Sequence, residues 1–114
     1  MLVAFSVAPS GTGRDDASVA DAVADAVRVV RASGLPHRTD AMFTTIEGPD
    51  WDTVMDVVKR ATEAVQAHGT RVSLVLKADI RPGHEGELDG KVRRVEERLA
   101  DAGNDAGADA GNDR

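Results

Sequence analysis

The 114-residue sequence contains no cysteine and few aromatic residues: one Trp, two Phe and no Tyr. The lack of cysteine excludes disulfides, thiol nucleophiles and thiolate metal ligands, and it leaves the redox compartment undetermined. The lack of aromatic rings predicts a core of aliphatic side chains, chiefly Val and Ala. A chain of this length forms one domain that buries about two-thirds of the surface exposed by the unfolded chain, so self-association would add stability.

The sequence is also short of positive charge. It has 14 Lys and Arg against 20 Asp and Glu, which gives a net charge of −6 and an isoelectric point near 4.9. Nucleic-acid binding depends on Lys and Arg that neutralise phosphates, so we expect no nucleic-acid partner and no anionic membrane partner. The acids are mainly Asp and the bases mainly Arg, a bias that suggests a high-GC genome and, as a hypothesis, a halophilic source.

Long apolar runs are absent as well. No stretch approaches the roughly 20 apolar residues of a membrane-spanning helix. The opening segment Met1–Phe5 is short, lacks a basic leader and is soon followed by Pro9, which argues against a signal peptide. We therefore expect a cytoplasmic protein.

The hydrophobic periodicity predicts the order strand, helix, strand, strand, helix, strand. The first strand covers residues 2–8 and the last covers 71–81, while 37–40 and 42–47 form a hairpin between two helices. This order is the split βαβ pattern of a ferredoxin-like α+β sandwich. We expect the second helix to turn one face to the sheet, composed of Trp51, Val54, Met55, Val58, Ala61, Thr62 and Val65.

An extra C-terminal helix is expected over residues 88–100. Its apolar stripe of Leu88, Val92, Val95 and Leu99 is narrow, which suits packing on a sheet edge or on a partner subunit. From Asp101 the sequence becomes a low-complexity run of Asp, Ala, Gly and Asn. We therefore predict a ferredoxin-like domain over residues 1–100 and a disordered acidic tail over 101–114.

Polar side chains occur near the ends of the apolar strands, where they can meet a small ligand. In the hairpin strand, alternation places Thr45 and Glu47 on one face and Thr44 on the other. Glu47 can bind a cationic or amino-bearing heterocycle that the Thr hydroxyls orient, or it can merely cap the strand end. Both interpretations stay open.

Charged residues alternate with apolar ones in the last strand. Lys77, Asp79 and Arg81 share one face, where they form a wall of a site, a solvated row or a subunit contact. The loop 9–13, between the first strand and the first helix, has backbone amides that can hold a polar ligand. It lacks the Lys of a P-loop, and its composition alone favours a plain turn.

The sequence offers no arrangement typical of a metal site or of nucleophilic catalysis. His37, His68 and His84 are far apart and lack the spacing of metal ligands. Ser10 has no local histidine partner, and no nucleophile-elbow motif is present. We predict no catalytic residue, no metal and no cofactor, and thus a non-enzymatic protein.

Three segments together resemble the small thiamine-binding (YkoF-like) family of ferredoxin-like proteins: Phe5–Gly11, Met42–Gly48 and Arg71–Arg81. The resemblance covers roughly residues 1–99. It implies thiamine or its pyrimidine moiety as the ligand, a homotetramer built as a dimer of dimers, and a ligand site bordered by the first loop. The candidate ligand-binding residues are Ser6, Ser10, Gly11, Thr44, Thr45, Glu47, Lys77 and Asp79.

One residue departs from the family pattern. Phe43 stands where the family usually carries Gly before the Thr, and a bulky ring there is expected to narrow or reshape the pocket. Two other function classes stay open. One is a structural or regulatory oligomeric module without a specific ligand. The other is a small acid/base enzyme that uses Glu47 with Lys77 or Asp79, which a perturbed pKa of Glu47 would favour.

Overall fold

The computed structural model describes residues 1–10 and 16–113, with side chains described outside 16–18 and 104–113. Its elements are β1 (Leu2–Ser10), α1 (Asp16–Ala32), β2 (His37–Thr39), β3 (Thr44–Glu47), α2 (Trp51–Gln66), β4 (Arg71–Asp79) and α3 (Glu87–Asp113). The strands form one antiparallel sheet in the order β2-β3-β1-β4. The predicted element order and the ferredoxin-like α+β class are confirmed.

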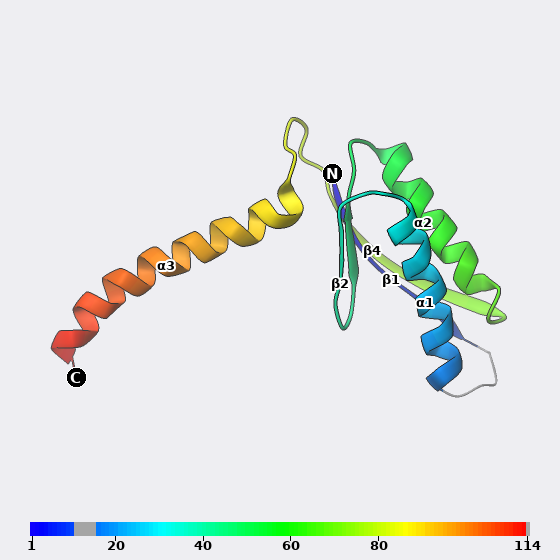
Figure 1. The fold of residues 1–114 in the computed structure, drawn as a ribbon, viewed down its shortest axis with the longest axis horizontal. Helices are drawn as coiled ribbons and strands as arrows, with labels where there is room; N and C mark the ends of the chain where they lie inside the picture. Colours follow the sequence, from blue (N-terminus) through cyan, green and yellow to red (C-terminus); the bar gives the residue numbers. More distant parts are fainter. Residues whose placement is uncertain (11–15, 114) are drawn as a thin grey trace.

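One face of the sheet is covered by α1 and α2, which pack side by side on it (Figure 1). Alternate residues of β1 point into this interface, so Val3, Phe5 and Val7 are buried there. The helices contribute side chains at helical spacing, namely Ala22, Ala26, Val30, Val54, Val57, Val58, Ala61 and Val65. The core is aliphatic apart from Phe5, as the composition predicts, and each fully buried Val contributes about 1.5–3 kcal/mol.

The start of α2 differs from the prediction at one residue. Asp50 caps the helix by accepting a hydrogen bond from the backbone N–H of Thr53 at 2.8 Å, and this bond lowers the pKa of Asp50. Trp51 was expected to face the core, but it is 52% exposed. The expectation is wrong because Trp51 is the first residue of the helix, and helical side chains lean toward the N-terminus, here beyond the sheet.

The β2–β3 hairpin is short and ends before β1 does. Its turn is closed by the carboxylate of Asp40, which accepts hydrogen bonds from the backbone N–H groups of Met42 and Phe43, both at 3.0 Å. The pairing of β3 with β1 runs from Glu47 to Thr44, which lies opposite Phe5. Consequently, β1 continues from residue 6 to residue 10 with β4 on one side and without β3 on the other.

The second face of the sheet, called the open face below, carries Val75, which is 56% exposed. Helix α3 begins against this face but then extends away from the sheet (Figure 1). Every described side chain from Lys91 to Gly103 is exposed. Helical structure continues through Asp113, where the sequence predicts disorder from Asp101, because helix hydrogen bonds are local and need no tertiary partner. The division into domain and tail stays a prediction that truncation tests.

Candidate functional site

The strand register places most of the predicted site residues on the open face. Thr45 and Lys77 flank Ala4, and Glu47 and Asp79 flank Leu2. Thr44 points to the helix-covered face and is buried, as the alternation predicts. Four of the predicted residues therefore come together on the open face at one end of the sheet.

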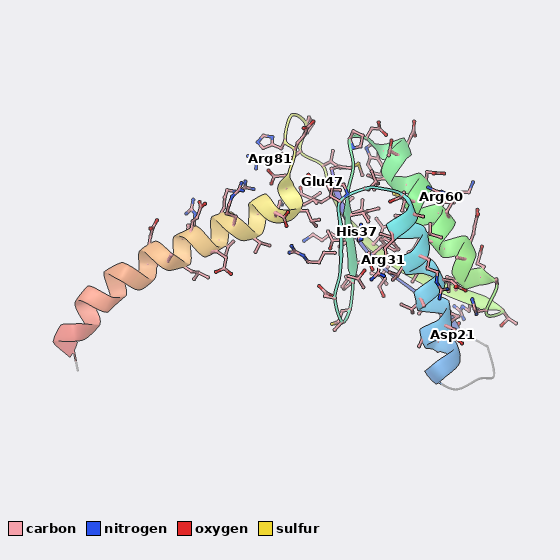
Figure 2. All side chains as sticks on the ribbon, viewed as in Figure 1. Asp21, Arg31, His37, Glu47, Arg60 and Arg81 are labelled. Atoms are coloured by element: carbon pink, nitrogen blue, oxygen red, sulfur yellow. The ribbon has the colours of Figure 1, made fainter. Side chains whose placement is uncertain are left out.

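The start of α3 binds the two acidic residues of this set, Glu47 and Asp79. Glu47 is buried, and its carboxylate accepts hydrogen bonds from the backbone N–H groups of Glu87 at 2.8 Å and Leu88 at 3.1 Å. Figure 2 places Glu47 between the sheet and the first turn of α3. A carboxylate at a helix N-terminus satisfies unpaired amides and complements the helix dipole. Glu47 thus caps the start of α3, whereas the sequence suggested either a cap of its own strand end or a ligand contact.

Three ion pairs hold the same turn. Asp79 pairs with Lys91, which lowers the pKa of Asp79 through their hydrogen bond. Arg38 pairs with Asp89 at 2.8 Å. Arg94 pairs with Glu87 at 2.6 Å and lowers the pKa of that carboxyl. Two of these pairs join the sheet to α3, through Asp79 and Arg38, and the third lies within α3.

The first loop lies at the other end of the sheet. Ser10 pairs with Arg71, whereas Glu47 pairs with Leu2, and at roughly 3.3 Å per residue these ends of β1 are about 26 Å apart. Two antiparallel neighbouring strands have their C-terminal ends at opposite ends of the sheet, so the C-terminal ends of β1 and β3 cannot converge. Within one chain, Ser10 and Glu47 do not reach one small ligand, and Gly11 lies outside the described residues.

A cavity of about 170 Å³ lies between α1, the hairpin turn and the part of β1 beyond β3. We call it the hairpin cavity. Its wall includes Ser6 and Thr44 from the predicted set, together with Val27 and Phe43. A cavity of about 150 Å³ holds one benzene ring, so the hairpin cavity has room for a single aromatic ring.

Two polar residues that the sequence did not single out, Thr39 and Asp40, also line the hairpin cavity. The hydroxyls of Thr39 and Thr44 lie 3.1 Å apart and share a hydrogen bond. The backbone N–H groups of Phe43 and Met42 lower the pKa of Asp40, which keeps this carboxylate ionised. An Asp in a hairpin turn is common for structural reasons, so no sequence signal distinguished it.

A larger cavity of about 590 Å³ lies at the opposite end of β1. Its wall includes Met1, Trp51, Ile80 and Glu47, together with the loop from Arg81 to Gly86. Its two buried or capping carboxylates are engaged, since Glu47 binds the amides of α3 and Asp50 caps α2. Arg81, His84 and Glu85 also line it, so the recess has both apolar and charged walls.

The remaining titratable residues form no further site in the described part of the chain. His68 Nε2 lies 2.6 Å from Asp25 Oδ2, which joins the end of α2 to α1. Among residues 1–10 and 16–113, no group of three His, Cys, Asp or Glu side chains is placed to hold a metal ion. In the same part of the chain, no helix is long and apolar enough to cross a membrane.

The sheet order and the two helices on one face define a ferredoxin-like α+β domain. The sequence matches the model of a family described as thiamine-binding protein over residues 3–96, and the chain belongs to this family. A relative from Mycobacterium bovis, named UPF0045 protein, is 54% identical over 99 residues, which cover 87% of this chain and 94% of the relative.

Two solved structures share the fold and part of the sequence. A hypothetical protein from Methanocaldococcus jannaschii is 31% identical with a TM-score of 0.72, and the match covers 84% of this chain and 95% of that one. A domain of unknown function from Bacillus cereus is 37% identical with a TM-score of 0.69, and the match covers 80% and 85% of the two chains.

Proposed function

We propose that this protein is a non-enzymatic cytoplasmic binding protein for thiamine or its pyrimidine moiety, that it acts as a homo-oligomer, and that the pyrimidine ring binds in the hairpin cavity. The observation that carries the proposal is the match of residues 3–96 to the thiamine-binding protein family. The ring-sized cavity beside the hairpin supports it, since the family motif around Thr44 forms part of its wall.

The lining of the hairpin cavity suits the two halves of thiamine. Val27 and Phe43 offer apolar contacts to an aromatic ring, and the Thr39 and Thr44 hydroxyls offer hydrogen bonds. The thiazolium half is a cation, and the ionised carboxylate of Asp40 belongs to a residue of the wall. Charge-assisted contacts of this kind are stronger than neutral ones.

A binding role is favoured over acid/base catalysis by what Glu47 does. A general base must reach the proton that it removes. The Glu47 carboxylate instead accepts two amide hydrogen bonds from α3, and Asp79, which with Lys77 was one of its two possible partners in the enzyme hypothesis, is paired with Lys91. Both groups are thereby committed to the fold.

Self-association is supported by the exposed apolar surface. Val92, Val95 and Leu99 form a stripe along α3, and each is about half exposed. Because α3 extends away from its own sheet, this stripe is free to cover a second copy (Figure 1). We propose a homotetramer arranged as a dimer of dimers. The same surfaces support the second candidate, an assembly module without a specific ligand.

Calorimetric titration with thiamine, its phosphates and free aminopyrimidines tests the proposal. Thr44→Val keeps the shape and removes one hydroxyl, so it should lower thiamine affinity about twofold to tenfold, in line with roughly 0.5–1.5 kcal/mol per hydrogen bond. Thr62→Val on α2 is the matched control and should leave affinity unchanged. No binding by the parent protein up to millimolar ligand would leave the assembly module as the better explanation.

A further inference from the structure

The backbone of β1 presents its hydrogen-bonding groups alternately to its two neighbours. The terminal ammonium of Met1 donates to the carbonyl oxygen of Gly48 at 2.6 Å, and the Met1 carbonyl oxygen accepts from the Gly48 N–H at 3.0 Å. Residues two apart in a strand direct their N–H and C=O to the same side. Val3, Phe5 and Val7 therefore direct theirs toward the side of β3.

At Val7 this side has no strand. The pairing of β1 with β3 ends at Phe5 and Thr44, so Met42 would be the next partner of Val7. The N–H of Met42 donates to the carboxylate of Asp40 instead, which turns the chain away. Within the described residues, no backbone hydrogen bond joins Val7 to the hairpin.

Pro9 lies two residues further on and directs its backbone nitrogen to the same side. A proline has no N–H to donate, so it fits within a strand only where that side lacks a ladder partner. The pairing of Pro9 with Val72 on β4 is maintained. The position of Pro9 therefore agrees with an edge of β1 that is unpaired from Ser6 onward.

Val7 lines the hairpin cavity, and its side chain is buried on the helix-covered face. Its N–H and C=O, which have no partner among residues 1–10 and 16–113 on this side, lie at the edge of β1 that forms one wall of this cavity. Backbone groups in such a place need a partner, since an unpaired buried donor or acceptor costs about 1–3 kcal/mol. A ligand that offers an acceptor beside a donor meets that need.

We propose that the free backbone edge of Val7 recognises the aminopyrimidine: its N–H donates to a ring nitrogen and its C=O accepts from the adjacent exocyclic amine. The ligand thereby takes the place that β3 leaves vacant beside β1. The recognition follows the pattern in which an extended chain pairs with an exposed sheet edge, here with a heterocycle as the partner. This inference rests on the proposed function and adds to it the chemical basis of specificity.

The test compares thiamine with oxythiamine, in which a carbonyl replaces the 4-amine of the pyrimidine. The replacement makes the ring nitrogen a donor and the substituent an acceptor, which opposes both backbone groups of Val7. Sites built to hydrogen-bond a substrate group reject analogues that lack it strongly. We expect oxythiamine to bind on the order of a hundredfold more weakly or worse.

The outcomes separate the two proposals. Equal affinities would overturn recognition by Val7 while leaving thiamine binding in place, whereas no binding of thiamine would overturn the proposed function and this inference together. Amide hydrogen exchange followed by NMR gives a second readout. Thiamine should protect the N–H of Val7 and leave that of Phe5, which already pairs with Thr44, unchanged. An unprotected Val7 amide in the saturated complex would contradict the inference.

Discussion

The two faces of the sheet are built from the same strands but differ in how far their side chains are buried. On the helix-covered face, Val3 and Ile46 are 0% exposed, whereas on the open face Val75 is 56% exposed. The stripe on α3 that could cover the open face of another copy ends at Leu99, which is 60% exposed. The comparison teaches that one face specifies the fold of a single chain, while the other leaves apolar side chains exposed, as the proposed self-association requires.

Shortening a side chain on each face should give the largest contrast. Ile46→Ala removes a fully buried side chain and should lower the free energy of unfolding by about 2–5 kcal/mol. Val75→Ala, on the open face, should change it by less than about 0.5 kcal/mol in dilute protein. Urea denaturation measures both. Similar losses for the two variants would mean that a single chain depends on both faces equally.

A charge in the α3 stripe should act on association. Burying a Leu contributes about 1.5–3 kcal/mol, so Leu99→Asp should weaken self-association roughly tenfold to a hundredfold. The unfolding of the single chain should hardly change, because Leu99 is exposed. Light scattering over a concentration series measures the effect. Ala100→Asp adds the same charge beside the stripe and is the control, and an equal effect from it would show that charge alone weakens assembly.

Removing the charge of Glu47 should loosen the start of α3. Hydrogen bonds to charged groups contribute about 1.5–3 kcal/mol and those to neutral groups about 0.5–1.5 kcal/mol, so Glu47→Gln should cost about 1 kcal/mol locally. The amides of Glu87 and Leu88 should then exchange about fivefold faster. Glu63→Gln on α2 serves as the control. Unchanged exchange at both amides would remove Glu47 as the cap of α3.

On the helix-covered side of the sheet, low pH should lower the free energy of unfolding through protonation of Asp25. The hydrogen bond from His68, followed by the charges of Arg28 and His68, lowers the pKa of Asp25 below its usual 3.8. A lowered folded pKa adds stability at pH values above 3.8, and this is lost as pH falls through the lower folded value. Asp25→Asn should therefore flatten the pH dependence of unfolding below about pH 4, a small effect because the pair is partly exposed. Asp21→Asn on the same helix should keep the parent slope.

Deleting residues 101–114 should have the smallest effect. This segment has no large apolar side chain, so the melting temperature and the oligomeric state should stay unchanged. Calorimetry and light scattering of the truncated chain measure both. A melting temperature lower by several degrees would show that the segment packs on the protein.

Period-two alternation made the sheet predictable. It placed Thr45 and Glu47 on the face opposite Thr44, and Lys77 with Asp79, as the register shows. Trp51 was misplaced because periodicity says little about the first residue of a helix. These side-chain directions are set by local alternation, so they can be derived from one sequence alone.

The site was less predictable because it depends on where elements end relative to one another. Ser10 and Glu47 are each the last residue of an apolar strand, but antiparallel pairing places these two residues at opposite ends of the sheet. The hairpin cavity exists because β3 begins only at Thr44, opposite Phe5, while β1 continues to Ser10, and no local pattern encodes that difference in length. The capping of α3 by Glu47 likewise joins residues 40 positions apart.

The position of the apolar stripe on α3 sets the geometry of any assembly built on it. At about 1.5 Å per residue, the part of α3 from Glu87 to Leu99 spans about 20 Å. The nine residues of β1 span about 30 Å, so an arm of this length crosses a large part of a second sheet. Two copies that each extend such an arm over the other would be held by a reciprocal clasp, as the two-fold symmetry of homodimers allows. Release then requires both arms to detach together, so exchange of subunits would be far slower than the opening of either arm alone.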